Sequence, residues 1–330
     1  MTQANAQTGR TLLALSKADH TLAMVDPVTL KITARIPVGE DPHELVASAD
    51  GLTAYVCIYG GGSLHEINVI DLVAQKPLKS IDTRPLFGPH DITFVDGKVW
   101  FTAEGSKSIG RYDPNTGKLD WSMGTGQDRT HMIYVSEDAK QIYTTNISSG
   151  TVSSITDRTI HSGSTAPPGA PGRQDWMQTL VNTAKGSEGF DVLPDQSELW
   201  TASGESGMIF IIDLASKKLK AKIDAKVLGA NRLKFTPDGR LAFVSSLKSG
   251  ELTVFDVKTY KEVKRIKLGR GAAGLLMDDI GSRAFVACSP DNYIAIVDLK
   301  TLQVIGKLDV GGTPDGLAWA VRKTAVPAVR

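Results

Sequence analysis

Residues 231–266 read NRLKFTPDGRLAFVSSLKSGELTVFDVKTYKEVKRI, and this stretch decides the fold. It contains four short apolar runs: residues 233–235, residues 241–244, a run that ends at Asp256, and residues 262–266. Turn residues separate the runs, first as Pro237-Asp238-Gly239 and then as a loop rich in Ser and Gly. Branched and aromatic residues favour strands, whereas Gly, Asn and Asp favour tight turns. The stretch therefore predicts four consecutive short strands.

The same pattern recurs along the chain at a nearly fixed interval. An aspartate closes the third strand of each repeat, and these residues are Asp26, Asp71, Asp113, Asp157, Asp213, Asp256 and Asp298. Their successive spacings are 45, 42, 44, 56, 43 and 42 residues. A period of about 40–45 residues with four strands is typical of a propeller blade. The sequence predicts an all-β fold, a seven-bladed β-propeller with four antiparallel strands per blade.

The two ends of the chain complement each other. Residues 11–37 supply three strands without an inner one, and residues 314–319 supply an inner strand with no blade after it. Pairing this C-terminal inner strand with the N-terminal strands would close the ring and remove the exposed sheet edges. We therefore expect a single propeller over residues 11–322, with an N-terminal tail at residues 1–10 and a C-terminal tail at residues 323–330.

Composition and charge exclude several classes of partner. Lys and Arg total 37 against 36 Asp and Glu, so no excess of positive charge favours nucleic acid. No apolar run reaches the roughly 18–20 residues that a membrane span requires. We expect a monomer that acts on a small-molecule substrate, with no nucleic-acid partner and no insertion into a membrane.

The cysteines and the first residues bear on the compartment. Cys57 and Cys288 lie in separate repeats on apolar strands, which favours buried free thiols over a disulfide. Residues 1–7 are small and polar and lack the basic and apolar regions of a signal peptide. Such a segment is also typical of a mature exported chain. We expect a periplasmic or secreted protein, and a cytoplasmic one stays an alternative.

One step of the repeat carries the chemistry. The residue just ahead of each short inner strand is, in chain order, His43, His90, His131, Glu188, Asn231, Ala273 and Asp315. Inner strands of a propeller surround its axis, so equivalent positions in several blades converge on one end of the channel. Three of the six histidines in the chain occupy this one step in adjacent blades. We expect them to meet.

Three imidazoles and a carboxylate form a common ligand set for a transition metal ion. The sequence therefore predicts one divalent ion, Mn, Zn, Fe, Ni or Cu, bound by His43, His90, His131 and Glu188 at the channel mouth. Two alternatives remain: a metal-free His/Glu catalytic or binding site, and polar residues that merely line a wet channel. If metal binds, a nearby carboxylate is expected to accept the second ring N–H of a ligand histidine, and the candidates are Glu44, Asp91 and Glu104.

Other polar residues are candidates for contacts with substrate. Arg232 and Arg270 lie near the start of inner strands, where either guanidinium could hold a carboxylate, although each could equally form an ordinary ion pair at the surface. Asn231 and Asp315 share the step of the histidines and are further candidates.

The long interval between Asp157 and Asp213 indicates an insertion at residues 161–186. We expect it to lie over the channel mouth as a partial lid that brings Arg173 and Trp176 to the substrate, with a short helix over residues 175–181. A plain surface loop is the alternative.

The repeats resemble those of the YVTN family of seven-bladed propellers. The similarity is carried by Ala54-Tyr55-Val56-Cys57, by Leu241-Ala242-Phe243-Val244 and by the stretch from Ala284 to Gly316. It covers nearly the whole chain and implies the fold. Propellers host enzymes, ligand-binding proteins and scaffolds, so it does not by itself imply an activity.

The site arrangement resembles that of two metal-dependent propeller enzymes, virginiamycin B lyase and oligogalacturonate lyase. This resemblance implies β-elimination, with the ion at His43, His90, His131 and Glu188 and with Tyr59 or Glu104 as the base. Propeller lactonases imply hydrolysis instead, and the carotenoid-cleaving oxygenases imply oxidation at an iron centre. Many YVTN proteins are exported propellers that bind ligands or partners without catalysis. We expect a metal-dependent lyase or hydrolase that acts on a small polar substrate.

Overall fold

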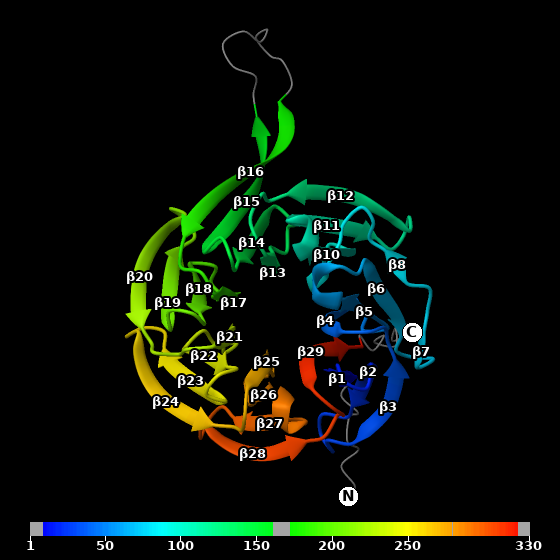
Figure 1. Cartoon of the computed structure of the whole chain (residues 1–330), viewed down its shortest axis with the longest axis vertical. Helices are drawn as coiled ribbons and strands as arrows, with labels where there is room; N and C mark the ends of the chain where they lie inside the picture. Colours follow the sequence, from blue (N-terminus) through cyan, green and yellow to red (C-terminus); the bar gives the residue numbers. More distant parts are fainter. Residues whose placement is uncertain (1–8, 161–171, 279, 323–330) are drawn as a thin grey trace, which may run out of the picture.

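The computed structural model describes residues 9–160, 172–278 and 280–322, and these residues form seven antiparallel sheets arranged around a central axis. Figure 1 shows the ring closed, with the inner strands surrounding the channel. The predicted all-β propeller is confirmed. No helix of the described residues is long and apolar enough to cross a membrane.

The strands follow the predicted order, with the inner strand of each blade given first. Blade 1 contains β29 (Pro314–Val321), β1 (Arg10–Ser16), β2 (Thr21–Val25) and β3 (Ile32–Pro37). Blade 2 contains β4 (Pro42–Ala47), β5 (Thr53–Ile58), β6 (Glu66–Asp71) and an interrupted outer strand, β7 (Lys76–Pro77) and β8 (Ile81–Asp82). Blade 3 contains β9 (Pro89–Val95), β10 (Lys98–Ala103), β11 (Ser108–Asp113) and β12 (Lys118–Gly124).

The remaining blades are built in the same way. Blade 4 contains β13 (Thr130–Val135), β14 (Gln141–Asn146), β15 (Thr151–Ile160) and β16 (Arg173–Asn182). Blade 5 contains β17 (Ser187–Val192), β18 (Glu198–Ser203), β19 (Met208–Asp213) and β20 (Lys218–Asp224). Blade 6 contains β21 (Ala230–Phe235), β22 (Leu241–Ser246), β23 (Glu251–Asp256) and β24 (Lys261–Lys267). Blade 7 contains β25 (Ala272–Met277), β26 (Arg283–Cys288), β27 (Tyr293–Asp298) and β28 (Gln303–Leu308). Three short 3-10 turns, η1 (Gly60–Gly62), η2 (Glu104–Ser106) and η3 (Ser289–Asp291), follow second strands.

The repeated aspartates have a structural role. The carboxylate of Asp26 accepts hydrogen bonds from the backbone N–H groups of Val28 and Thr29, which fixes the turn from β2 to β3. Five other aspartates of the series accept equivalent turn bonds: Asp71, Asp113, Asp213, Asp256 and Asp298. Asp157 is the exception, because β15 continues through it to Ile160. The irregular interval in the sequence thus marks a longer hairpin.

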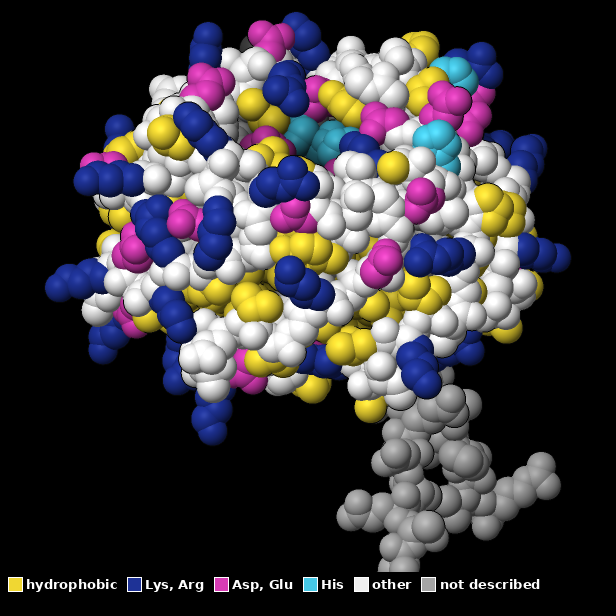
Figure 2. All heavy atoms as spheres, turned by 60° about the horizontal axis from the view of Figure 1, so that its bottom comes forward, with side chains coloured by type: hydrophobic (Ala, Val, Ile, Leu, Met, Phe, Trp, Pro, Cys, Tyr) yellow, Lys and Arg dark blue, Asp and Glu magenta, His cyan; other side chains and the backbone are white. Residues whose placement is uncertain are grey.

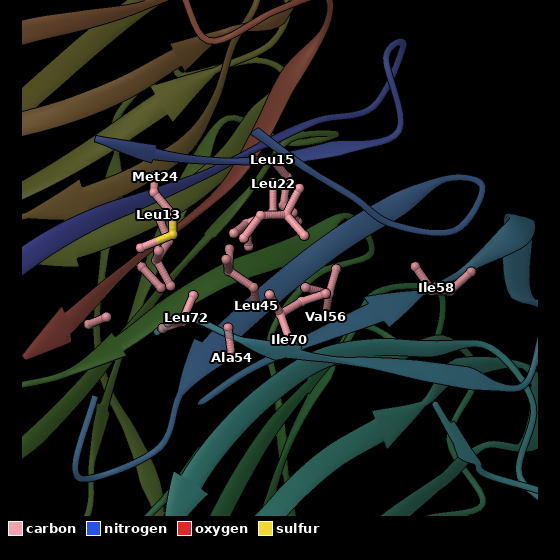
Figure 3. Packing of buried hydrophobic residues seen from close by; sticks show 13 residues of the cluster. Leu13, Leu15, Leu22, Met24, Leu45, Ala54, Val56, Ile58, Ile70 and Leu72 are labelled. Carbon is pink, nitrogen blue, oxygen red and sulfur yellow. The ribbon is translucent and has the colours of Figure 1, made fainter. Parts of the chain in front are cut away.

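Apolar side chains fill the space between neighbouring blades. In Figure 3, Leu13, Leu22 and Met24 of blade 1 pack with Leu45 and the second strand of blade 2. Trp100 and Trp200 of second strands are the largest fully buried side chains. Cys57 and Cys288 are buried and free, as predicted.

The chain ends close the ring through β29 and β1, as predicted. The fully buried Asp278 carboxylate of blade 7 binds Arg10 at 2.8 Å, and the Arg10 guanidinium lies 4.3 Å from the ring centre of Trp319. The indole Nε1 of Trp319 donates to the carbonyl of Met277 at 2.9 Å. These contacts join the first and last strands to the neighbouring blade.

We expect the Asp278→Asn variant to lower the free energy of unfolding by about 2 kcal/mol, because it weakens a buried charge-assisted bond at the closure. Urea denaturation of the two proteins measures the difference. The matched control is Arg240→Gln, which removes an exposed pair with Asp238 and is expected to leave the midpoint unchanged. Equal effects of the two changes would contradict the proposed closure role.

The helix predicted over residues 175–181 is wrong. Residues 173–182 form β16, which pairs with β15 at ten positions, from Thr151↔Asn182 to Ile160↔Arg173. Trp176 packs on Trp121, with ring centres 5.1 Å apart. This cross-strand pairing and the aromatic contact override the helical spacing of the apolar residues.

The placement of Arg173 and Trp176 over the channel mouth is also wrong. Strand β15, the third strand of blade 4, begins at Thr151, which pairs with Asn146 of the second strand; Asn146 in turn pairs with Thr130 at the start of the inner strand. From that end of the blade β15 runs away for nine residues, or about 30 Å. Ile160 at the end of the third strand and Arg173 at the start of the fourth therefore lie at the end of the blade opposite to Thr151. Arg173 pairs there with Asp175 and is exposed. Of the predicted insertion, residues 161–171 lie outside the described part of the chain.

Candidate functional site

Each inner strand begins with the same local irregularity. The second residue of the strand lies within a break in the pairing with the neighbouring strand, as between Pro42 and Leu45 in β4 or between Thr130 and Ile133 in β13. All seven inner strands have this β-bulge. A bulge re-aims a side chain, and bulges are frequent beside functional sites.

The seven residues at this second position, hereafter the register residues, come together. They are His43, His90, His131, Glu188, Asn231, Ala273 and Asp315, and all seven line one pocket of about 300 Å³. Figure 2 shows histidine side chains in a hollow on one face of the molecule. The structure thus places the four predicted metal ligands in one pocket, together with Asn231 and Asp315.

The three histidines form a stack. The ring centres of His43 and His90 lie 4.1 Å apart, and those of His90 and His131 lie 3.6 Å apart. The phenol ring of Tyr59 meets the first two histidines edge-on, at 5.2 and 5.0 Å. Equivalent atoms from blades 2, 3 and 4 therefore lie within reach of one small ligand.

His90 is the most unusual member of the stack. It is fully buried, and among the described residues neither of its ring nitrogens has a hydrogen-bond partner. His43 Nδ1 is also unsatisfied, because Asp315 Oδ2 lies 3.6 Å away. A buried polar group without a partner costs about 1–3 kcal/mol, so native proteins seldom keep one without a reason. Each of these two imidazoles thus has at least one ring nitrogen that no described residue engages.

Their protonation suits that role. Burial lowers the pKa of His43 to about 3, with the nearby Lys17 charge adding to the effect. Burial and the neighbouring imidazoles hold the pKa of His90 well below its ordinary value. Both rings are therefore neutral near pH 7, which is the form that binds a metal ion.

His131 lies between two carboxylates. Its Nδ1 is 2.6 Å from Glu104 Oε2 and its Nε2 is 3.3 Å from Glu188 Oε1. Burial alone would lower the pKa of His131, but hydrogen bonds to the two carboxylates raise it. Burial would likewise raise the pKa of Glu104 and of Glu188, yet their bonds to His131 dominate and lower each to about 2.

Of the two roles predicted for Glu104, a base or a hydrogen-bond partner of a ligand histidine, the geometry matches the second, because Glu104 contacts His131 Nδ1. Its Oε1 accepts hydrogen bonds from the Tyr59 hydroxyl at 2.6 Å and from Arg129 Nε at 3.0 Å. Burial and the bond to Glu104 raise the pKa of Tyr59, so the phenol keeps its proton. Tyr59 is a hydrogen-bond donor near neutral pH, and Glu104 is fully engaged by donors.

Arg232 is not free to bind a substrate carboxylate, because its guanidinium is already paired with two protein carboxylates. It is 4% exposed and bridges Glu188, at 2.9 Å, and Glu44. The surface-pair interpretation is equally wrong, because the guanidinium is buried. Asn231 Nδ2 also donates to Glu188 Oε1, at 2.6 Å. These two residues hold Glu188 in place, and Glu44 is thereby engaged with Arg232 and not with a histidine.

Arg270 forms an ion pair at the surface, which was the alternative to a role in substrate binding. Its guanidinium is exposed and pairs with Asp291 at 2.6 Å. It is not among the residues that line the pocket with the histidines.

Three side chains of the cluster could hold a metal ion. Ligand atoms of His90, Glu104 and His131 lie within 4.8 Å of one another. This set shares His90 and His131 with the predicted one and uses Glu104 in place of His43 and Glu188. Because Glu104 contacts Nδ1 of His131, it also matches the carboxylate partner that usually orients a ligand histidine.

The sequence did not single out several residues of the rim. Lys17 and Arg129 line the pocket beside the histidines, and so does Leu247. A signal for Arg129 was present: it stands two positions before a register residue, where four of the seven blades have glycine, namely Gly88, Gly186, Gly229 and Gly271.

Comparison with known proteins supports the fold and leaves the activity open. No protein-family model matches the chain. The uncharacterized protein YncE of Salmonella typhimurium is 26% identical over 144 residues, which is 42% of this chain and 40% of YncE. The matched region thus spans less than half of that relative.

Solved structures match over almost the whole length. A candidate 6-phosphogluconolactonase from Bacteroides fragilis has a TM-score of 0.75 at 15% identity, covering 97% of this chain and 99% of that one. A functionally unknown protein from Desulfotomaculum acetoxidans has a TM-score of 0.76 at 14% identity, covering 95% and 99%. The dihydro-haem d1 dehydrogenase NirN has a TM-score of 0.64 at 15% identity, covering 91% of this chain and 63% of NirN. At such identities the likeness concerns the fold alone. The chain is therefore a seven-bladed β-propeller with a YncE-like relative, as the resemblance to YVTN propellers predicted.

Proposed function

We propose that this protein is a metal-dependent hydrolase with one divalent transition metal ion at the channel mouth. The observation that carries the proposal is His90: a fully buried imidazole with two unsatisfied nitrogens, stacked between two further histidines. No residue of the ranges 9–160, 172–278 and 280–322 bonds to these nitrogens, which costs free energy that a bound ion would recover.

The residues divide into ligands and supports. His43, His90, His131 through Nε2, and Glu188 would hold the ion. Glu104 would then accept the Nδ1–H of His131, while Arg232 and Asn231 orient Glu188. Against the effect of burial, the two carboxylates raise the pKa of His131 and so favour its protonated form in the metal-free protein, and a divalent cation would balance the same negative charge.

The reaction class follows from which groups are free. When bound, such an ion supplies Lewis acidity, which polarises a carbonyl group and acidifies water. The Tyr59 phenol keeps its proton and donates a hydrogen bond to Glu104, so Tyr59 helps to orient that carboxylate. Elimination, the alternative, needs a base that removes a proton from carbon. Glu104 is held by His131, Tyr59 and Arg129, and Tyr59 keeps its proton. Neither of the two residues expected as the base is therefore free to take a proton from carbon, and this observation favours hydrolysis.

The size of the pocket supports a small substrate. Its volume of about 300 Å³ lies at the lower end of the range for small-molecule sites. The name of the Bacteroides fragilis neighbour, a candidate 6-phosphogluconolactonase, is compatible with ester or lactone hydrolysis. Export and a monomeric state stay predictions of the sequence.

The proposal is tested with the purified protein and a His131→Ala variant, each loaded with zinc or manganese and then dialysed. We expect about one equivalent of metal in the parent and less than a tenth of that in the variant, because His131 belongs to both ligand sets. The matched control is His65→Ala, which removes a histidine outside the pocket and is expected to retain full metal content.

Activity separates the two reaction classes. Small lactones and esters are added to the metal-loaded proteins, and two signals are measured. Release of acid reports hydrolysis, and the ultraviolet absorbance of a new conjugated double bond reports elimination. Acid release that is lost in His131→Ala supports hydrolysis. A new double bond would instead establish elimination, and retained metal without turnover of either kind would identify a binding protein.

A further inference from the structure

The residue two positions before each register residue has a left-handed backbone in all seven blades. Four of these residues are glycine, with φ between 65° and 78°: Gly88, Gly186, Gly229 and Gly271. The other three are Asp41 at 51°, Arg129 at 57° and Thr313 at 50°. Glycine adopts this conformation without penalty, whereas a residue with a Cβ is strained there. Blades 1, 2 and 4 thus keep a side chain at a position where the fold favours glycine.

Two of the three side chains are linked to positive charge at the rim of the pocket: one pairs with a lysine and the other is itself an arginine. Asp41 pairs with Lys17 at 2.8 Å, and Lys17 is paired again by Asp315 at 3.6 Å. Arg129 is itself a rim cation, in blade 4. Residues held in a disfavoured backbone conformation occur in ordinary turns and also cluster at functional sites, and Arg129 lies at the pocket.

Arg129 is anchored at one atom and open at the others. Its Nε donates to Glu104, while in the described part of the chain its two terminal nitrogens make no hydrogen bond. The side chain is 47% exposed and lines the pocket beside His131. Burial opposes the charge, but the Glu104 carboxylate raises the pKa of Arg129, so the group is cationic at any physiological pH. Two parallel N–H groups are the natural partner of a carboxylate.

The wall formed by blades 6 and 7 has a different character. The register residue of blade 7 is Ala273, and Leu247 of blade 6 lines the pocket with its side chain 46% exposed. Leu247 and Ala273 offer apolar surface next to the polar Asn231, Arg232 and Ser289 of the same two blades, whereas blades 2 to 4 offer the histidines and Arg129. The pocket is therefore suited to a molecule with one charged end and one apolar end.

We propose that Arg129 determines specificity by binding a carboxylate of the substrate, and that the substrate is a small carboxylic acid whose apolar part lies against Leu247. The proposal deepens the proposed function, on which it rests for the idea that the pocket binds a substrate. It does not depend on the identity of the metal ion.

The test is calorimetric titration of the zinc-loaded protein with acetate, butanoate, hexanoate and the uncharged hexan-1-ol. Affinity is expected to rise about threefold to fourfold for each added methylene. Hexanoate is expected to bind at least tenfold more tightly than hexan-1-ol. Arg129→Gly should reduce the affinity for hexanoate to that for hexan-1-ol. The zinc content of the variant should equal that of the parent. Its melting temperature should be equal or higher, because glycine already occupies this position in four blades.

Leu247→Ser is the matched control. In this variant the affinity is expected to be the same for acetate and hexanoate. Hexanoate should still bind more tightly than hexan-1-ol. Hexanoate binding that survives Arg129→Gly, or an equal affinity for hexanoate and hexan-1-ol, would overturn the proposal. Failure of the proposed metal site has a separate readout, because a parent protein that retains no zinc can still be titrated with the same compounds to test Arg129.

Discussion

Replacement of Arg232 by methionine is expected to lower the free energy of unfolding of the metal-free protein by about 3–5 kcal/mol. The guanidinium is 4% exposed and bridges Glu44 of blade 2 and Glu188 of blade 5 across the channel. These charges raise the pKa of Arg232 although burial opposes it. Methionine keeps most of the apolar stem but leaves two carboxylates in the channel without their cation. Urea denaturation at neutral pH measures the loss.

Two further samples identify the cause of that loss. Arg240→Met removes an exposed arginine that pairs with Asp238, and no change in the midpoint is expected. The double variant Arg232→Met with Glu44→Gln is expected to recover part of the stability, because one buried charge is gone. Added zinc should also stabilise Arg232→Met, since Glu188 then has a cation again. A loss below about 1 kcal/mol would show that the bridge is not what holds Glu188.

Replacement of His90 by phenylalanine is expected to have opposite effects on stability and on metal binding. The change removes two buried nitrogens without partners, each costing about 1–3 kcal/mol, and adds a slightly larger ring that offsets part of the gain. We expect the metal-free variant to be more stable than the parent by about 1–2 kcal/mol. Zinc retention after dialysis should fall below a tenth of the parent value. A replacement that stabilises the protein but abolishes ligand binding is typical of a residue kept for function.

The control for this experiment is His65→Phe, at a partly exposed histidine near Asp82. Neither stability nor zinc content is expected to change there by a measurable amount. A His90→Phe variant that is less stable than the parent, or that still retains one equivalent of zinc, would contradict the role assigned to His90.

The fold and the convergence of the site were predictable because both follow from repetition. Asp26 and its equivalents mark the period, and the period fixes the number of blades. His43, His90 and His131 occupy one step of that period, and a closed ring brings equivalent steps together. Local sequence was enough for these conclusions, since each blade repeats the same strand order.

The errors concern contacts between distant segments. Residues 175–181 have apolar spacing that suits a helix, but ten paired positions with β15 and the contact of Trp176 with Trp121 decide for a strand. Arg232 pairs with Glu44, which lies 188 residues away in the chain. No local pattern reveals such a partner. Arg129 is a different case, because its signal is local: it stands at a position where four of the seven blades have glycine.

X-ray absorption spectroscopy of the protein with one equivalent of zinc examines the metal centre itself. At the channel mouth the ion should have three imidazole nitrogens at about 2.0–2.1 Å and one carboxylate oxygen, and the His90→Phe variant should lose this signature. An ion surrounded by oxygen atoms alone, or the same spectrum in parent and variant, would place the zinc elsewhere and contradict a metal centre built from the histidine stack.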